Sequence, residues 1–180
     1  MDIKFCTQCG GSVIFILPDK DTHQRYICTQ CGFIHYQNPR VITGCLVYKD
    51  EKVLLCKRAI EPRFGLWTVP AGFMENGEST RLAAQRETFE EAGVEVVLNR
   101  LFVIANLTHA NQVYMLYLAE LLDDYFHFSC ESSYESSDVQ LFTKEQIPWD
   151  DIAFYTVKLA LIRFFEDLNN DQFLLHEIDF

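Results

Sequence analysis

The chain has 180 residues, of which 49% are hydrophobic and 14% aromatic, and it carries a formal net charge of −11. This length predicts one ordinary domain with a small appendage, and the composition predicts a well-buried core and excludes intrinsic disorder. The acidic balance argues against a protein that wraps nucleic acid, because phosphate contacts need a basic face, whereas a divalent cation can still bring a small phosphorylated substrate to an acidic chain. No apolar run follows a basic stretch at the N-terminus, and no apolar window is long enough for a membrane span, so we expect a cytoplasmic protein.

The first element along the chain is a pair of C-x2-C motifs, each followed by a glycine. Between them, β-prone runs at residues 12–17 and 24–27 flank a turn, which predicts a hairpin. Two such motifs at this separation are typical of a four-cysteine structural zinc site, so we expect a zinc ribbon over residues 1–35 whose stability comes from the metal. Disulfide bonds or a redox role are the alternative interpretations. The predicted zinc ligands are Cys6, Cys9, Cys28 and Cys31.

The second predicted domain covers residues 36–180 and combines β-prone runs with two helical patterns. Strands are expected at residues 41–48, 53–57, 68–69, 94–107, 112–121 and 139–142, with a polar loop at 129–137. Helices are expected over about residues 79–92 and 151–168, the second with Ile152, Tyr155, Leu159, Ile162 and Phe165 at helical intervals. Strands flanked by two helices predict a layered α/β domain, and the tail after residue 171 has no clear pattern.

Three glutamates recur at helical spacing in the first of these helices. Glu87, Glu90 and Glu91 stand at i, i+3 and i+4, so their carboxylates project from one side, whereas Leu82 and Phe89 fall on the far side and are expected to pack inward. Repulsion among three carboxylates does not stabilise a helix, but a hard divalent cation with oxygen ligands relieves it. We therefore expect Mg²⁺, or Mn²⁺ in its place; a solvated acidic helix is the alternative.

The stretch from Gly72 to Val94 is similar to the Nudix box, G-x5-E-x7-R-E-U-x-E-E-x-G-U, in which U is a bulky apolar residue. Every fixed position matches, and Thr88 is a mild departure at one apolar position. The runs I-H-Y-Q-N-P-R at residues 34–40 and I-P-W at residues 147–149 also resemble Nudix hydrolases that carry an N-terminal zinc ribbon. This resemblance implies an α/β/α sandwich on a mixed sheet.

The resemblance also implies an activity, which is hydrolysis of the diphosphate bridge in a nucleoside diphosphate linked to another group, with ADP-ribose or FAD as the expected substrate. In such enzymes the box glutamates hold Mg²⁺, here Glu87, Glu90 and Glu91, joined by the backbone carbonyl of Ala71. We interpret Arg86 as a residue that holds a glutamate in place through a bidentate pair. Glu78, at the helix start, has either a structural or a direct role.

The general base is open between a box glutamate and a carboxylate on a later loop. We favour Glu135, because E-S-S-D-V-Q-L-F is placed like a loop glutamate in Nudix relatives. Glu120, Glu131 and Asp138 are the alternatives. The expected substrate contacts, each with a surface or core role as its alternative, are Arg58 and Arg63 for phosphates and Phe64 and Trp67 for a base.

Two other functions stay open. The chain can be a nucleotide-binding module on a Nudix scaffold, although the intact box glutamates argue against this. It can also act on NADH or capped RNA, but it lacks the S-Q-P-W-P-F-P-x-S motif of NADH-cleaving relatives, and residues 1–35 hold only three Lys or Arg against three Asp. We therefore expect a small nucleotide substrate, no nucleic-acid partner and a homodimer, because relatives are commonly dimers.

Overall fold

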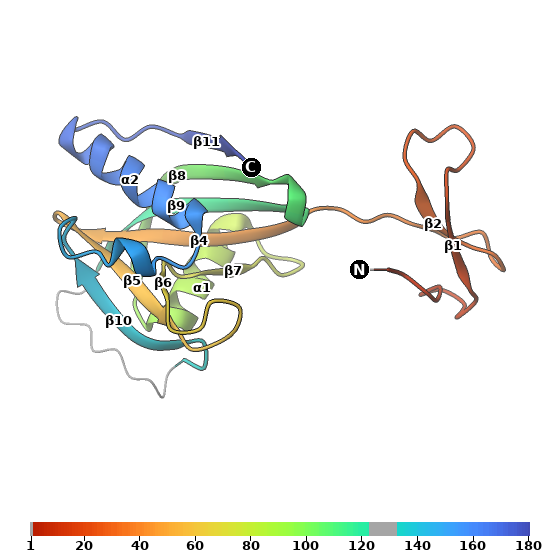
Figure 1. The fold of residues 1–180 in the computed structure, drawn as a ribbon, viewed down its shortest axis with the longest axis horizontal. Helices are drawn as coiled ribbons and strands as arrows, with labels where there is room; N and C mark the ends of the chain where they lie inside the picture. Colours follow the sequence, from red (N-terminus) through yellow and green to blue (C-terminus); the bar gives the residue numbers. More distant parts are fainter. Residues whose placement is uncertain (1, 123–132) are drawn as a thin grey trace. The chain divides into compact units, whose positions relative to one another are not determined.

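The computed structural model describes residues 2–122 and 133–180. The chain divides into two compact units, the first ending at Asn38 and the second running from Pro39 to Phe180. Figure 1 labels the elements of both units. Glu131, one of the alternative bases, and residues 129–132 of the expected Ser-rich loop lie outside the described residues. None of the described helices is long and apolar enough to cross a bilayer.

The first unit is a three-stranded antiparallel sheet in the order β1-β2-β3. Its strands are β1 (Val13–Ile16), β2 (Arg25–Cys28) and β3 (Ile34–His35). The expected hairpin is therefore present, with Val13 opposite Cys28 and Ile16 opposite Arg25. The third strand was not predicted, because two residues are too few to show a pattern.

The second unit is built on an eight-stranded mixed sheet with the main order β10-β5-β4-β9-β8-β11, in which β6 pairs with β5 and β7 with β4. The strands are β4 (Arg40–Lys49), β5 (Lys52–Arg58), β6 (Trp67–Thr68), β7 (Ala71–Phe73), β8 (Val96–Leu107), β9 (Gln112–Leu121), β10 (Ser136–Phe142) and β11 (His176–Asp179). The helices are α1 (Thr80–Ala92) and α2 (Tyr155–Asn169), with 3₁₀ turns at Thr108–Ala110 and Trp149–Asp151. Parallel β4–β9 and β8–β11 pairs alternate with antiparallel ones, which confirms the mixed α/β sandwich.

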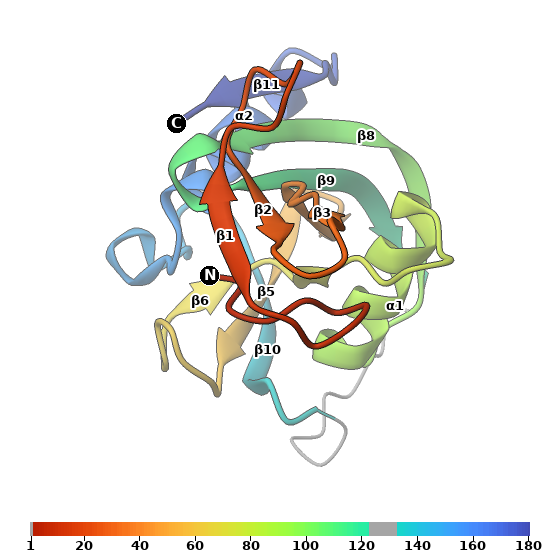
Figure 2. The ribbon, with the colours of Figure 1, turned by 90° about the vertical axis from the view of Figure 1, so that its right-hand side faces the viewer.

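Two hydrophobic cores lie on opposite faces of this sheet because side chains alternate along each strand. On β9, for example, Leu116 and Leu118 belong to the core that contains Phe164 of α2, whereas Tyr117 and Ala119 belong to the core under α1. Figure 1 shows the two helices on opposite sides of the strands. Register shifts in the β8–β9 pair accompany the curvature of these two strands in Figure 2, as expected of β-bulges.

Helix α1 begins and ends where its sequence caps it. The Ser79 side chain accepts a hydrogen bond from the Leu82 amide, and Gly93 ends the helix in the left-handed conformation, where a residue without Cβ is favoured. The expectation that Leu82 and Phe89 pack inward is wrong, since they are 58% and 57% exposed. Small side chains such as Ala84 pack on the sheet instead, which lets the helix approach closely and turns two glutamates of the box toward the protein.

Helix α2 and the tail also differ from expectation. Tyr155 is 65% exposed, and the buried face runs through Val157, Leu161 and Phe164, so of the predicted positions within the helix only Phe165 is buried. The unpatterned tail forms β11, which pairs in parallel with β8. His176 Nε2 of β11 lies 2.8 Å from Asp167 Oδ2 of α2, and this hydrogen bond ties the tail to the helix.

A close backbone contact fixes the start of the box. Along β4, residues Ile42–Gly44 pair with Phe73–Ala71 of β7. A Cβ on Gly44 would overlap the Pro70 carbonyl and Ala71, so only glycine allows this approach. The loop before α1 is thereby anchored on a central strand.

Candidate active site and zinc site

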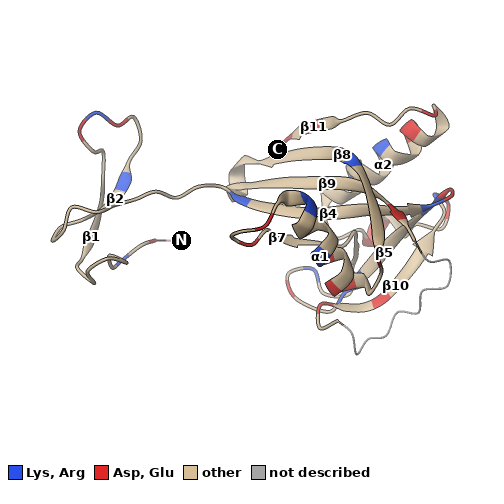
Figure 3. Ribbon diagram, turned by 180° about the vertical axis from the view of Figure 1, so that it is seen from behind, with Lys and Arg blue, Asp and Glu red and all other residues tan. Residues whose placement is uncertain are grey.

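A cavity of about 590 Å³ is lined by residues of α1, β7 and the start of α2, among others. Its size is that of a small-ligand pocket. Six carboxylates line it, namely Glu61, Glu75, Glu87, Glu90, Glu91 and Glu135. Figure 3 shows acidic positions gathered on α1 and on the loop that precedes it. The structure therefore brings the three box glutamates, Ala71 and the predicted base Glu135 to one cavity.

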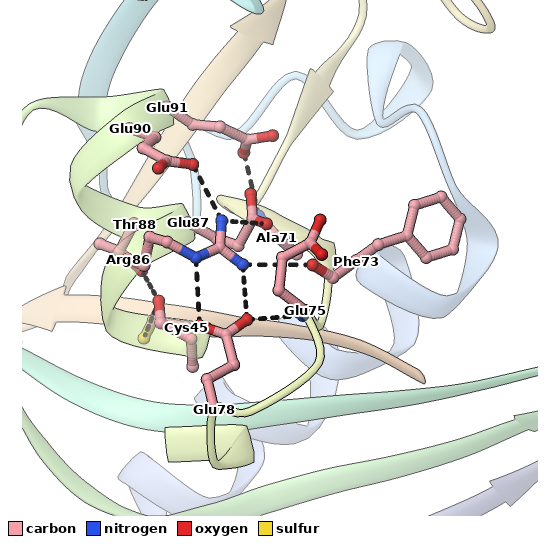
Figure 4. Close-up of polar contacts among 11 residues, drawn as sticks. Cys45, Ala71, Phe73, Glu75, Glu78, Arg86, Glu87, Thr88, Glu90 and Glu91 are labelled. Carbon is pink, nitrogen blue, oxygen red and sulfur yellow. Dashed lines mark hydrogen bonds and ion pairs between the residues drawn. The ribbon is translucent and has the colours of Figure 1, made fainter. Parts of the chain in front are cut away.

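The box glutamates differ in burial. Glu87 and Glu91 are 9% and 5% exposed, whereas Glu90 is exposed to solvent. The Ala71 amide donates to Glu91 Oε2 at 2.9 Å, and the Glu87 carboxylate packs against Gly72 so closely that any Cβ there would overlap it. The box glycine thus makes room for a carboxylate. Figure 4 shows this carboxylate, that of Glu87, beside the Arg86 guanidinium.

Arg86 is the centre of an ion-pair network (Figure 4). Its Nε and Nη2 donate to the two carboxylate oxygens of Glu78 at 3.2 and 2.8 Å. Its Nη1 donates to Glu87 at 2.7 Å and to Glu90 at 2.9 Å, and Nη2 also reaches the Phe73 carbonyl at 3.2 Å. The bidentate pair is thus made with Glu78, and Arg86 braces two of the predicted metal ligands against the loop.

Burial sets the protonation of the two inner glutamates. It raises the pKa of Glu91 to about 8, an effect that the Ala71 amide opposes and the nearby carboxylates of Glu87 and Glu135 reinforce. Burial also raises the pKa of Glu87, against the pull of Arg86. Glu78 behaves oppositely, because its hydrogen bonds with Arg86 lower its pKa. A bound divalent cation would favour the ionised form of these two buried acids and so offset the cost of their burial.

The donor set fits a hard cation in chemistry, since carboxylates and one backbone carbonyl are the ligands that Mg²⁺ and Mn²⁺ prefer. Glu87 and Glu90 are held by Arg86, and Glu91 by the Ala71 amide, so the three side chains are oriented before any ion binds. The carboxylate oxygens lie farther apart than the four sulfurs of the cysteine cluster. Among the described residues, this cluster alone brings three or more possible metal ligands within 4.8 Å of one another.

The predicted substrate contacts separate into two groups. Arg58 lines the cavity, whereas Arg63, Phe64 and Trp67 are not among its lining residues. Trp67 is core, with its ring 5.0 Å from Phe142 in an edge-on contact, because β6 places it beneath the sheet.

The alternative bases that the structure describes lie elsewhere. Glu120 is exposed on β9, and Asp138 of β10 accepts a hydrogen bond from Gln140 at 2.7 Å. Neither lines the cavity, whereas Glu135 does.

Other cavity residues were missed by the sequence analysis. Among them are Gln112 and Tyr114 at the start of β9 and Phe154 and Thr156 at the start of α2. No motif marks them, because they meet the box only through the tertiary fold. A strand pattern predicts which residues alternate, not which of them reach a cavity.

The four cysteines of the first unit form a second candidate site. The Cys6 and Cys31 sulfurs are 3.7 Å apart and those of Cys9 and Cys28 are 3.5 Å apart. Thiolates held tetrahedrally by zinc at about 2.3 Å lie about 3.8 Å from one another, whereas disulfide sulfurs are bonded at about 2.05 Å. All four cysteines are free, so the cluster fits a zinc ion and the disulfide alternative is wrong.

The backbone around these sulfurs suits a bound metal. Gly10 and Gly32 adopt φ of 75° and 73°, and each amide closes a turn onto the carbonyl of the first cysteine of its motif. Backbone amides of Cys31 and Gln30 donate to the Cys28 sulfur at 3.4 Å and lower the pKa of this thiol to about 6. A thiolate is the form that binds zinc.

Two family models match the chain, one on each unit. The model described as NUDIX domain matches residues 38–160, and the one described as Nudix N-terminal matches residues 4–37. The first match covers well over half of the chain, so the protein belongs to the Nudix family. It is a Nudix hydrolase with an N-terminal zinc-ribbon module.

Among curated relatives, the NAD-capped RNA hydrolase NudC of Vibrio vulnificus is 31% identical over 151 residues, which covers 81% of this chain and 53% of the relative. NudC of Haemophilus influenzae strain PittGG is 35% identical over 103 residues, or 55% of this chain and 37% of the relative. The chain thus spans about half the length, or less, of these relatives. Because these relatives are named as RNA hydrolases, they do not support our expectation that the protein has no nucleic-acid partner.

Solved structures agree on the fold. A NUDIX hydrolase from Nitrosomonas europaea is 49% identical with a TM-score of 0.92, and the match covers 99% of both chains. An ADP-ribose pyrophosphatase from Streptococcus suis is 19% identical with a TM-score of 0.61, covering 79% of this chain and all of that one. At that identity the second likeness concerns the fold alone.

Proposed function

We propose that the protein hydrolyses the diphosphate bridge of a nucleoside diphosphate linked to another group, with ADP-ribose or FAD as the substrate and Mg²⁺ or Mn²⁺ as the cation. The observation that carries this proposal is the set of Glu87, Glu90 and Glu91, oriented by Arg86 and the Ala71 amide on the wall of a small-ligand cavity. A nucleotide-binding module would not require three pre-oriented carboxylates.

In the proposed reaction, water attacks one phosphorus of the bridge. A new P–O bond forms, the bond from that phosphorus to the bridging oxygen breaks, and the other phosphoryl group leaves with the bridging oxygen as a phosphate monoester. A divalent cation held by the box glutamates and the Ala71 carbonyl would supply charge stabilisation for this step. Arg86 keeps Glu87 and Glu90 in place and has no hydrogen-bonding capacity to spare for the substrate, since its three nitrogens are all engaged.

Glu135 is the proposed general base. Its carboxylate acts electrostatically on both Glu87 and Glu91, and its backbone carbonyl accepts a hydrogen bond from the Ala59 amide at 2.7 Å, which anchors this position to β5 and the segment after it. A base there can take the proton that the attacking water releases. Arg58 is the proposed phosphate contact, because it reaches the cavity with a cation that no carboxylate neutralises in the described structure.

A second candidate activity has support from the relatives' names. Proteins called NAD-capped RNA hydrolases would cleave the same bond in a dinucleotide cap, so NADH or NAD-capped RNA is the alternative substrate. Against it, the S-Q-P-W-P-F-P-x-S motif is absent, and the residues after the box run directly into β8. The cytoplasmic location and the homodimer stay predictions.

The test is a substrate panel with Mg²⁺, read by mass spectrometry, that contains FAD, ADP-ribose, NADH, NAD-capped RNA, coenzyme A and nucleoside triphosphates. We expect AMP from FAD or ADP-ribose, and no AMP from the Glu90→Gln/Glu91→Gln double variant. Turnover confined to NADH and capped RNA would replace the proposed substrate by the alternative one. A folded, zinc-loaded protein that turns over nothing would favour the nucleotide-binding module.

A further inference from the structure

Besides the proposed cation ligands, the cavity is lined by polar groups from β5, β9 and the start of α2, which we call the α2 end. Tyr114 of β9 and Thr156 of α2 line it and are 7% and 8% exposed. Within residues 2–122 and 133–180, neither hydroxyl has a hydrogen-bond partner. The unpaired side-chain atoms that solvent cannot reach are His35 Nε2 and Thr43 Oγ1, so the Tyr114 and Thr156 hydroxyls are not among them. The Tyr114 and Thr156 hydroxyls therefore open into the cavity that they line.

The first turn of α2 adds more free donors at this end. Its N-cap residue, Phe154, provides no side-chain cap, and the first turn contains no acidic residue. The Lys158 amide is the first to bond back, to the Phe154 carbonyl at 3.0 Å. The amides of Tyr155, Thr156 and Val157 have no partner in the described part of the chain, so the partial positive charge of this helix end is not neutralised.

Arg58 brings a full positive charge to the same place. Its Nε donates to the Pro62 carbonyl at 2.9 Å, and its Cζ lies 5.2 Å from the centroid of the Phe154 ring, on the residue that caps α2. Its charge also acts on the Tyr114 hydroxyl and on the Glu91 carboxylate. A cation beside an uncapped helix N-terminus is unfavourable unless an anion binds there.

The groups named here can all donate a hydrogen bond. Burial raises the pKa of Tyr114 far above its ordinary value, so its hydroxyl stays protonated and can act as a donor. The Thr156 hydroxyl, the free amides and the Arg58 guanidinium are donors as well. The complementary ligand is an anion that is rich in acceptor oxygens, which is the chemistry of a phosphoryl group.

We propose that Arg58, Tyr114, Thr156 and the first turn of α2 form a phosphate subsite for the phosphoryl group that water does not attack. This inference rests on the proposed function, which requires a substrate with two linked phosphoryl groups. The glutamate end then takes the phosphorus that is attacked, and the α2 end holds the leaving phosphate.

The test uses inorganic phosphate, titrated by calorimetry into the full zinc-loaded chain without Mg²⁺, where the glutamate end repels anions. Tyr114→Phe and Thr156→Val remove one hydroxyl each and keep the bulk of the side chain. Each is expected to weaken phosphate binding by roughly tenfold, the effect of one lost hydrogen bond to a charged group. Arg58→Gln, at a partly exposed residue, should weaken it at least as much without risk to folding.

The matched control is Thr43→Val, which removes a buried hydroxyl that does not line the cavity and should leave phosphate affinity unchanged. The proposal is overturned if wild-type protein binds no phosphate without Mg²⁺, or if all three subsite variants bind it normally. It is also overturned if these variants lose affinity for adenosine instead of phosphate. Failure of the proposed function has a different signature, which is intact phosphate binding with no turnover of any substrate in the panel.

Discussion

The two units of this chain keep their folds by different means. In the first unit, the described residues include only three buried ones, Cys6, Cys28 and His35, and aromatic residues such as Phe5 and Tyr36 are 67% and 65% exposed. In the second unit, two cores cover both faces of a sheet. A metal cluster can thus replace a hydrophobic core where a segment is too short to build one, whereas the acidic cavity needs a rigid core behind it.

The largest effect is expected from removing one zinc ligand, which tests whether only the first unit depends on zinc for its fold. Cys28→Ser should unfold the first unit while the second stays folded, because metal binding supplies about 10 kcal/mol to small zinc modules. Amide NMR spectra would show resonances of the first unit collapsing and those of the second unchanged. Cys45→Ala, which removes a buried thiol of the second unit, is the control and should keep one zinc per chain. If the first unit stays folded in Cys28→Ser, its fold does not depend on the metal.

The next largest effect is expected on activity alone. Glu91→Gln removes a charge from the cavity and keeps the shape of the side chain, so kcat should fall by roughly 10²–10³, as for other lost charge-stabilising groups. Zinc content and the melting temperature should change little. Glu95→Gln, at an exposed position outside the cavity, is the control, and equal activity of the two variants would remove Glu91 from the site.

A substitution at Arg86 tests whether the ion-pair network stabilises the second unit in addition to orienting the box glutamates. Arg86→Gln leaves Glu78 and Glu87 without their partner, and we expect a loss of about 2 kcal/mol in the free energy of unfolding, together with weaker Mg²⁺ dependence. Arg163→Gln is a matched control, since its pair with Glu166 is half exposed and should contribute well under 1 kcal/mol. Urea denaturation of both variants compares the two losses directly.

The last prediction concerns the pH dependence of the second unit. The pKa of Glu91 is raised from 4.5 to about 8 in the folded protein, so the folded state binds this proton more tightly than the unfolded state does. Without Mg²⁺, stability from this group is complete below pH 4.5 and is lost as the pH rises through about 8. Added Mg²⁺ should therefore raise the melting temperature more at pH 8.5 than at pH 6. Glu91→Gln should abolish the difference, and an unchanged difference in this variant would assign it to another group.

The sequence predicted the box helix well because its signals are local. Ser79 and Gly93 cap the helix within one turn of its ends, and the spacing of the glutamates is a property of the helix itself. The same reasoning was wrong about Leu82 and Phe89, because periodicity shows which residues share a side but not which side faces the protein. Small residues and two buried carboxylates decided the orientation instead.

Residues brought together by the tertiary fold were beyond prediction. Tyr114 and Thr156 are 42 positions apart in the sequence, and neither belongs to a motif. Glu135 was placed near the cavity by its resemblance to a loop glutamate, whereas Trp67 was given a substrate role that its core position does not support. Local capping and spacing can be read from sequence, but the wall of a cavity depends on long-range packing.

The last strand has a consequence for solubility. β11 covers the edge of β8 and is fastened there, with Asn106 donating to Asp179 at 2.8 Å and Thr108 donating to the Phe180 carbonyl at 2.7 Å. Its exposed positions are the acidic Glu177 and Asp179. Without β11, residues 103–106 of β8 would offer an unpaired edge to a neighbouring molecule, whereas a short, charged edge strand discourages such pairing. These few residues therefore protect the protein from edge-to-edge aggregation.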